Sequence, residues 1–200
     1  EGLINYSPRT LNGEYARECL KNGIFACHSL DVSTLVITIN FPNEDALKNT
    51  ISHLNYAIEI ARYFHVELAL ECALPWEHFA HLLDSVSPDF KVCMDMLNPL
   101  RFQTGDPIRQ LHLLGKDKIS HFHMKDSISG LFSSKERGCV LLGQGDAHYP
   151  QAVDAIKEIH FSGWIFSENY YYLPPMNMQQ DFMNLSKTDC HTLKNSFCCE

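Results

Sequence analysis

Short apolar runs rich in β-branched residues alternate along this chain with longer segments of helical period. This alternation is typical of strand–helix units repeated around a parallel sheet, so we predict an α/β fold. The predicted strands cover residues 34–39, 66–70, 90–94, 119–124 and 163–167. The predicted helices cover residues 14–28, 44–64, 76–86, 107–114, 149–159 and 178–194, and a long Ser/Gly-rich loop is expected over residues 127–145.

Nothing in the sequence divides the chain into parts. It has 200 residues, of which 45% are hydrophobic, and it contains no linker, charge run or low-complexity tract. These values suit a globular domain with an ordinary core. We therefore predict a single domain over residues 1–200.

The charge excludes some classes of partner. With 16 Lys and Arg against 24 Asp and Glu, the formal charge is −8, which disfavours nucleic acid and anionic membranes. No apolar run approaches the roughly 20 residues of a membrane-spanning helix. The eight cysteines form no CxxC pair and are expected to be reduced thiols. We expect a cytoplasmic protein.

Four of the predicted strands have a metal-capable side chain at or near the C-terminal end: Glu71, Asp95, His123 and Glu168. In a parallel barrel these ends meet at one mouth, where such enzymes keep their active sites. A single carboxylate at this position more often caps a helix. Four such residues on successive strands instead favour a metal site, and three carboxylates with one imidazole suit Mn²⁺, Mg²⁺ or Co²⁺.

Several segments together resemble a known family. They are LALE at 68–71, VCMD at 92–95 with Asn98 following, HFHMKD at 121–126, LGQGD at 142–146 and GWIFSE at 163–168. The chain resembles the xylose-isomerase-like TIM barrels, within them the sugar phosphate isomerase/epimerase group, from about residue 14 to residue 172.

The resemblance implies an eight-stranded (β/α)8 barrel with one divalent metal ion. The implied ligands are Glu71, Asp95, His123 and Glu168. The implied reaction interconverts a ketose, a ketose phosphate or a related polyol by proton transfer through an enediolate, with Glu71 and Glu168 as the acid–base pair. We expect Mn²⁺, with Mg²⁺, Co²⁺ or Zn²⁺ as alternatives. The expected partner is a small-molecule sugar or sugar phosphate.

Three further residues are candidates for binding substrate: Asn98, Lys125 and Arg137. Asn98 stands where the best-known ketose 3-epimerases have a histidine. Lys125 is expected either to hold a substrate hydroxyl or to form a salt bridge with Asp126. Arg137, with Lys135, either grips a phosphate or is a solvated loop charge.

Other functions remain open. A sugar-acid or inosose dehydratase on the same scaffold also begins with proton abstraction next to a carbonyl. A nuclease of the endonuclease IV type is disfavoured by the negative charge and by the lack of further ligand motifs. With about five of eight strand–helix units, the chain is expected to be the C-terminal part of a barrel, because complete barrels have about 250 residues. Two alternatives follow: an inactive truncated barrel, and a homo-oligomer in which uncovered sheet edges pair.

Overall fold

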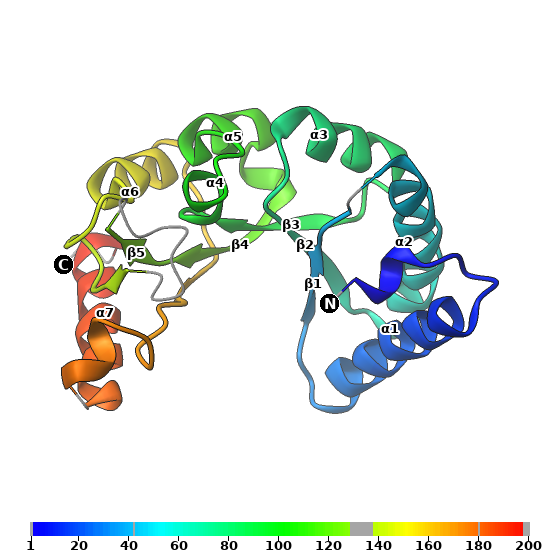
Figure 1. Cartoon of the computed structure of the whole chain (residues 1–200), viewed down its shortest axis with the longest axis horizontal. Coiled ribbons are helices and arrows are strands. Elements are labelled where there is room, and N and C mark those ends of the chain that lie inside the picture. The colour runs from blue at the N-terminus through cyan, green and yellow to red at the C-terminus, as the bar shows by residue number, and fades with distance from the viewer. Residues whose placement is uncertain (1, 42, 129–137, 180, 198–200) are drawn as a thin grey trace. The chain divides into compact units, whose positions relative to one another are not determined.

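Five parallel strands form the main sheet, in the order β1 (Thr34–Ile39), β2 (Glu67–Cys72), β3 (Lys91–Asp95), β4 (Ile119–Met124) and β7 (Trp164–Ser167) (Figure 1). The computed structural model describes residues 2–41, 43–128, 138–179 and 181–197. The chain comprises two compact units, unit 1 (residues 1–93) and unit 2 (residues 94–200). The predicted five-stranded α/β architecture is confirmed, with strand ends displaced by two residues at most.

Unit 1 is a helix-covered strand pair. Strands β1 and β2 pair in parallel, with Thr38 opposite Glu71. Helices α1 (Leu11–Ser29) and α2 (Glu44–Phe64) pack on each other and lie on the same side of these strands (Figure 1), and α3 (Trp76–Ser85) follows β2. Fully buried side chains fill the interior between the layers: Ile24, Leu54, Ala57, Ala61, Leu68 and Leu70.

The long helices of unit 1 begin at side-chain caps. Asn43 Oδ1 accepts a hydrogen bond from Ala46 N at 2.9 Å, and α2 has its predicted bounds. Thr10 Oγ1 accepts one from Gly13 N at 3.2 Å, so α1 begins three residues before the predicted start. Within this helix, position 13 requires glycine, because a Cβ atom there would lie 2.0 Å from the Ser7 carbonyl oxygen.

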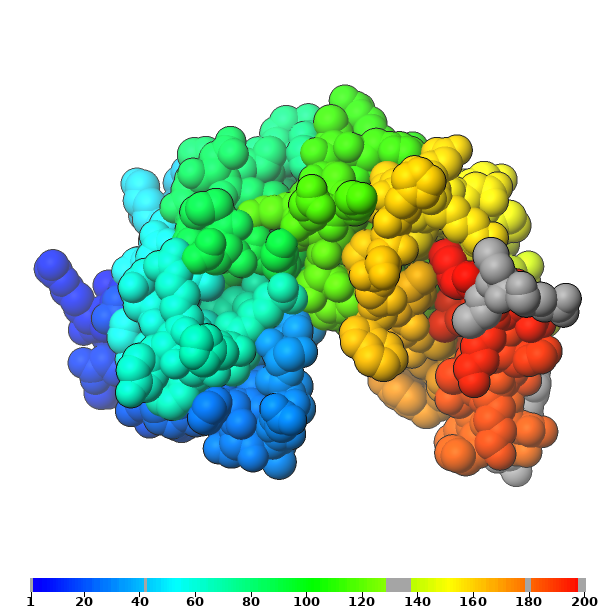
Figure 2. Space-filling model, turned by 180° about the vertical axis from the view of Figure 1, so that it is seen from behind, coloured from blue at the N-terminus to red at the C-terminus, as the bar shows by residue number. Residues whose placement is uncertain are grey.

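The described residues of unit 2 form the pair β4–β7, a short hairpin and four α-helices. The helices are α4 (Asn98–Arg101), α5 (Pro107–Leu114), α6 (Tyr149–Glu158) and α7 (Phe182–Phe197). Helix α6 contacts both α5 and α7. The 3-10 turn η4 (Met176–Gln179) and α7 replace the predicted single helix over 178–194, and in Figure 2 they lie at the surface in orange and red.

The predicted loop over residues 127–145 is partly ordered as a hairpin. Strand β5 (Asp126–Ser127) pairs antiparallel with β6 (Cys139–Val140). Residues 129–137, including Lys135 and Arg137, lie outside the described residues. Two-residue strands carry too little periodicity to be predicted from sequence.

Strand β7 ends the sheet and exposes aromatic side chains. Trp164 is 74% exposed, and its ring stacks on that of Phe166 at a centroid distance of 6.1 Å. The chain has one other tryptophan, Trp76, which is partly buried at the start of α3. The two tryptophans therefore lie one in each unit.

The structure bears on two further expectations, which concern membrane-spanning helices and disulfide bonds. Among the described helices, none is both long enough and apolar enough to span a membrane. The structure assigns no disulfide to the six cysteines within the described part of the chain: Cys19, Cys27, Cys72, Cys93, Cys139 and Cys190.

Candidate metal centre

Three of the four predicted metal ligands come together in unit 2. Asp95 ends β3, His123 lies on β4, and Glu168 directly follows β7. One potential ligand atom from each of the three side chains lies within 4.8 Å of those of the others. The amide of Met96 donates to the carbonyl of His123 at 3.1 Å, and the amide of Glu168 donates to the carbonyl of Met124 at 2.9 Å. Backbone pairing at the strand ends thus holds the three residues together.

Asp95 is fixed by the turn that follows it. Its Oδ1 atom accepts hydrogen bonds from the amides of Leu97 at 2.8 Å and Asn98 at 2.6 Å. Its Oδ2 atom contacts the ammonium group of Lys125 at 2.7 Å. Burial raises the pKa of Asp95, while Lys125 and the two amides lower it in part. The carboxylate is therefore oriented before any ligand arrives.

Lys125 is a buried cation between two carboxylates. Its Nζ atom lies 2.7 Å from Asp95 Oδ2 and 2.7 Å from Glu168 Oε2, and its side chain is 1% exposed. Burial opposes the charged form, but Asp95 and Glu168 outweigh it and raise the pKa of Lys125. Because one ammonium contacts two carboxylates, the geometry favours the ion-paired form. The alternative partner, Asp126, instead accepts hydrogen bonds from backbone amides.

Glu168 is the most accessible of the three ligand candidates. Its side chain is 38% exposed, and its Oε2 atom lies 3.1 Å from His123 Nδ1. Burial raises its pKa, but the hydrogen bond from His123 and the charge of Lys125 outweigh burial and lower the pKa to about 2. Glu168 is therefore ionised at neutral pH and can act as a ligand or accept a proton.

The donor set fits a divalent cation. Two carboxylates and an imidazole offer mainly oxygen ligands, which suit Mn²⁺, Mg²⁺ or Co²⁺, and zinc also accepts such ligands. The ammonium of Lys125 already occupies a position against both carboxylates, so this part of unit 2 is built to surround positive charge. Asp95, His123 and Glu168 are therefore residues of unit 2 that can hold a metal ion.

The remaining predicted site residues are Glu71, Asn98 and Arg137. Glu71 lies near the C-terminal end of β2 in unit 1, where Thr38 Oγ1 on β1 donates to its Oε2 atom at 3.4 Å. Asn98 begins α4, and its backbone N–H donates a hydrogen bond to Asp95 Oδ1. Arg137 lies outside the described residues.

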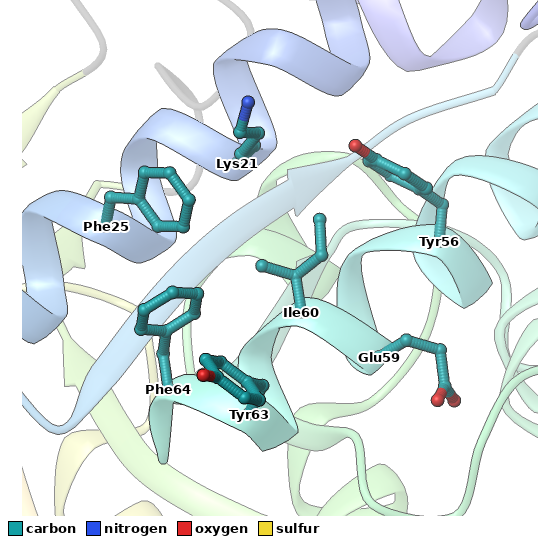
Figure 3. Close-up of a pocket in the computed structure, with 7 residues that line it drawn as sticks. All are labelled: Lys21, Phe25, Tyr56, Glu59, Ile60, Tyr63 and Phe64. Carbon is teal, nitrogen blue, oxygen red and sulfur yellow. The ribbon is translucent and has the colours of Figure 1, made fainter.

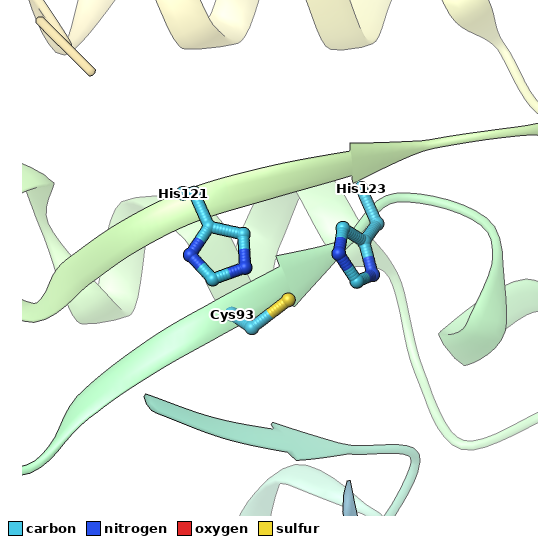
Figure 4. Close-up of side chains that lie close together, drawn as sticks. All are labelled: Cys93, His121 and His123. Carbon is cyan, nitrogen blue, oxygen red and sulfur yellow. The ribbon is translucent and has the colours of Figure 1, made fainter. Parts of the chain in front are cut away.

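His121 shares a face of β4 with His123. The two rings project from the same side of the strand (Figure 4), with centroids 5.3 Å apart. This follows from the alternation of side chains along a strand, which the sequence predicts. His121 packs edge-on against Phe166 at 5.5 Å, so its neighbours are partly aromatic.

Three buried polar residues support this centre; sequence reasoning named Asp126 only as a possible partner of Lys125, and it did not single out Asn169 or Asp189. Asp126 follows Lys125, Asn169 follows Glu168, and Asp189 lies on α7; all three side chains are buried. Asp126 belongs to the HFHMKD segment, so a motif could have indicated it. Asp189 occupies a helix without a motif, and only the tertiary structure identifies it.

An apolar pocket of about 440 Å³ lies between α1 and α2 in unit 1 (Figure 3). Aromatic rings form most of its wall, and Lys21 and Glu59 stand at its edge; the lining residues are Lys21, Phe25, Tyr56, Glu59, Ile60, Tyr63 and Phe64. None of these is a predicted site residue. The pocket offers packing surface and no cluster of ligand atoms.

Comparison with known proteins places this geometry in a family. The family model described as "Xylose isomerase-like TIM barrel" matches residues 4–187. No protein with a curated description matches the chain significantly.

Three solved structures share the fold at low identity. The IOLI protein with a bound zinc atom is 20% identical, with a TM-score of 0.73, over 90% of this chain and 68% of that one. D-allulose 3-epimerase from Methylomonas sp. in complex with D-allulose is 15% identical, with a TM-score of 0.74, over 97% of this chain and 73% of that one. A sugar phosphate isomerase/epimerase from Parabacteroides distasonis is 17% identical, with a TM-score of 0.69, over 90% of this chain and 66% of that one. Together with the family match, these findings show that the chain belongs to the xylose isomerase-like TIM barrel family.

Proposed function

We propose that this chain belongs to a divalent-metal-dependent isomerase or epimerase acting on a ketose, a ketose phosphate or a related polyol. The observation that carries the proposal is the convergence of Asp95, His123 and Glu168 around the buried ammonium of Lys125. Sugar isomerases and epimerases among the structural neighbours support it.

Glu71 is proposed as the fourth metal ligand and as the acid–base partner of Glu168. It lies near the C-terminal end of a parallel strand, as Asp95, His123 and Glu168 do, and these ends carry the active site in such barrels. Thr38 donates to its carboxylate, which restrains the side chain in unit 1. In this proposal one glutamate removes a proton from the substrate and the other returns one, a contribution of about 10²–10⁴-fold.

A divalent ion, when bound, would polarise the substrate carbonyl and stabilise the negative charge that develops as the proton leaves. Mn²⁺ is the proposed ion, because most donors are carboxylate oxygens; zinc in the IOLI structure supports a divalent site without fixing its identity.

Lys125 is proposed to bind a substrate oxygen. Its ammonium has three N–H donors, and two carboxylates accept from it. The third donor can hold a hydroxyl or the developing oxyanion of an enediolate. Asn98 and Arg137 remain proposed substrate-binding residues. The proposed setting is a reducing compartment, the cytoplasm, because no disulfide is assigned among the described cysteines.

The test compares the 200-residue chain with Glu168→Gln. The unmodified chain is expected to bind close to one Mn²⁺ and to exchange solvent deuterium into a ketose. Glu168→Gln should lower the exchange rate at least about 100-fold, because it removes the proposed proton acceptor. Exposed Glu158 on α6 provides the matched control, and Glu158→Gln should change neither quantity.

The outcomes separate the rival functions. Unchanged metal content and exchange in Glu168→Gln would contradict the proposal. Loss of water from a sugar acid or inosose, followed by the appearance of an enol or ketone product, would identify a dehydratase. Metal binding without exchange or dehydration would identify an inactive barrel.

A further inference from the structure

Asp189 is a charged side chain without contact with solvent. It lies within α7, near the C-terminus of the chain, and is 0% exposed. A buried carboxylate is costly unless hydrogen bonds or charges compensate for the lost water. The donors that compensate Asp189 show what this residue holds in place.

Three of these donors come from the segment that carries Glu168. Asp189 Oδ2 accepts hydrogen bonds from Asn169 Nδ2 at 2.6 Å, the Tyr171 hydroxyl at 2.9 Å and the Ser167 hydroxyl at 3.3 Å. Ser167 and Asn169 flank Glu168 on both sides. In extended chain, alternate side chains point to opposite sides, so these two turn toward α7 while Glu168 turns toward His123 and Lys125.

A second layer of hydrogen bonds runs beside the Lys125–Glu168 ion pair. Asn169 Oδ1 accepts from the amide of Asp126 at 3.0 Å, so residues 126 and 169 pair directly after residues 125 and 168. Asn169 Nδ2 also donates to the carbonyl of Val140 at 3.0 Å. Three hydrogen bonds, to Asp126, Val140 and Asp189, therefore orient the side-chain amide of Asn169.

Asp189 also reaches the glycine-containing loop. Its Oδ1 atom accepts from the amide of Leu142 at 2.9 Å. The carboxylate of Asp126 binds the same loop through the amides of Gly143 at 2.9 Å, Gly145 at 3.0 Å and Ala147 at 3.0 Å. One buried carboxylate from α7 thus connects this loop with the strand end that carries Glu168.

We propose that Asp189 is a positioning residue for Glu168, acting through Ser167 and Asn169. It does not contact the ligand atoms itself. By holding both neighbours of Glu168, it fixes where the backbone places that carboxylate relative to Asp95 and His123. The inference rests on the proposed function, because it assigns Glu168 the roles of metal ligand and acid–base group.

The experiment measures Mn²⁺ affinity by calorimetry and separates kcat from KM in deuterium exchange, well below the unfolding temperature. Asp189→Asn keeps the shape of the side chain but replaces an acceptor with a donor facing Asn169. Disturbing a residue that orients a metal ligand typically costs about 10–100-fold in affinity or activity, and we expect such a loss here. We expect kcat to fall more than KM rises.

Asp181→Asn is the matched control. Asp181 is exposed, and its Oδ1 atom accepts from the amide of Asn184 at the start of the same helix, so this variant perturbs α7 without touching Asp189. It should leave affinity and kcat within about twofold, as expected away from the positioning contacts. Where Asp189→Asn does not fold, Tyr171→Phe removes a single donor to Asp189 and should give a smaller loss in the same direction.

Crystal structures of the unmodified chain and the folded variant complete the test. A displaced Glu168 carboxylate in the variant supports the inference, even if the unmodified chain binds no Mn²⁺ and the proposed function fails. An unmoved Glu168 overturns it. Equal Mn²⁺ affinity and kcat in Asp189→Asn and the unmodified chain would overturn the inference while the proposed function stands.

Discussion

The interiors of the two units differ in chemistry. Of the buried polar or charged side chains in the described parts of the chain, three lie in unit 1 and nine in unit 2. Unit 1 is filled by aliphatic side chains between helices and strands, such as Leu54 and Leu68. Unit 2 buries charged residues, among them Asp126 and Asp189, whose hydrogen bonds connect a strand end, a loop and a helix.

This difference separates two ways of stabilising a fold. Apolar contacts depend on volume and tolerate replacement by residues of similar size. A buried carboxylate requires each of its donors in place, and each donor that loses it is left buried without a partner. Unit 2 is therefore expected to have fewer acceptable sequences than unit 1, and it carries three of the four proposed ligands.

The largest expected effect is that of Asp126→Ala. The carboxylate accepts hydrogen bonds from four backbone amides, those of Ser127, Gly143, Gly145 and Ala147. Its loss should lower the free energy of unfolding by about 4 kcal/mol, because buried amides lose their acceptors. Urea titration followed by circular dichroism measures this change. If Asp126→Ala lowered the free energy of unfolding by less than the conservative core change Leu54→Met in unit 1, the proposed difference between the two interiors would be contradicted.

Next in size is Leu54→Ala in unit 1. Leu54 is fully buried in α2, and its truncation leaves a cavity that should cost about 3 kcal/mol. Leu54→Met, which nearly conserves volume, should cost less than about 1.5 kcal/mol. Asp126→Asn, equally conservative in shape, should cost more than Leu54→Met, since its amide nitrogen would face amide donors. The same urea titrations measure all three variants, and equal costs for the two conservative changes would contradict this expectation.

The smallest expected effect concerns the pH dependence of stability and one of the three buried polar or charged side chains in the described part of unit 1, His53. His53 is buried in α2, with Nε2 2.9 Å from the carbonyl oxygen of Tyr6. Burial lowers its pKa below the usual 6.5, the hydrogen bond to Tyr6 raises it in part, and Arg17 lowers it further. The unfolded chain therefore binds the proton more readily than the folded chain. The associated stability is present above pH 6.5 and is lost as pH falls through the folded-state pKa.

His53→Gln tests this dependence, because glutamine can still donate to the Tyr6 carbonyl but does not titrate. We expect the free energy of unfolding of the unmodified chain to fall more steeply than that of His53→Gln between roughly pH 7 and pH 5. Parallel pH profiles would show that His53 does not contribute to this loss. The difference between the two profiles cancels the titration of the other histidines.

The sequence predicted the sheet well for a physical reason. Long segments of helical period and short β-branched runs are strong signals, and α2 and β4 have the predicted bounds. The predicted bounds were wrong where a contact between residues of different segments outweighed the local sequence preference. The first helix was predicted to begin at residue 14, yet Gly13 already lies inside α1, where the Ser7 carbonyl approaches too closely for any side chain.

The candidate site was predictable only in its outline. Ligand types at the strand ends indicated Asp95, His123 and Glu168, which the structure brings together. The partner of Lys125 was not predictable, because the choice between Asp95, Glu168 and Asp126 depends on side-chain direction. Asp189 could not be found at all, since a single aspartate in a helix usually faces solvent.

The uneven placement of the tryptophans affects how unfolding experiments are read. Trp164 in unit 2 is already 74% exposed in the folded chain, whereas Trp76 in unit 1 is partly buried. Intrinsic fluorescence should therefore respond mainly to the loss of unit 1. A denaturation curve recorded at tryptophan wavelengths would under-report damage to the polar interior of unit 2, and a variant such as Asp189→Asn could look intact by that signal alone.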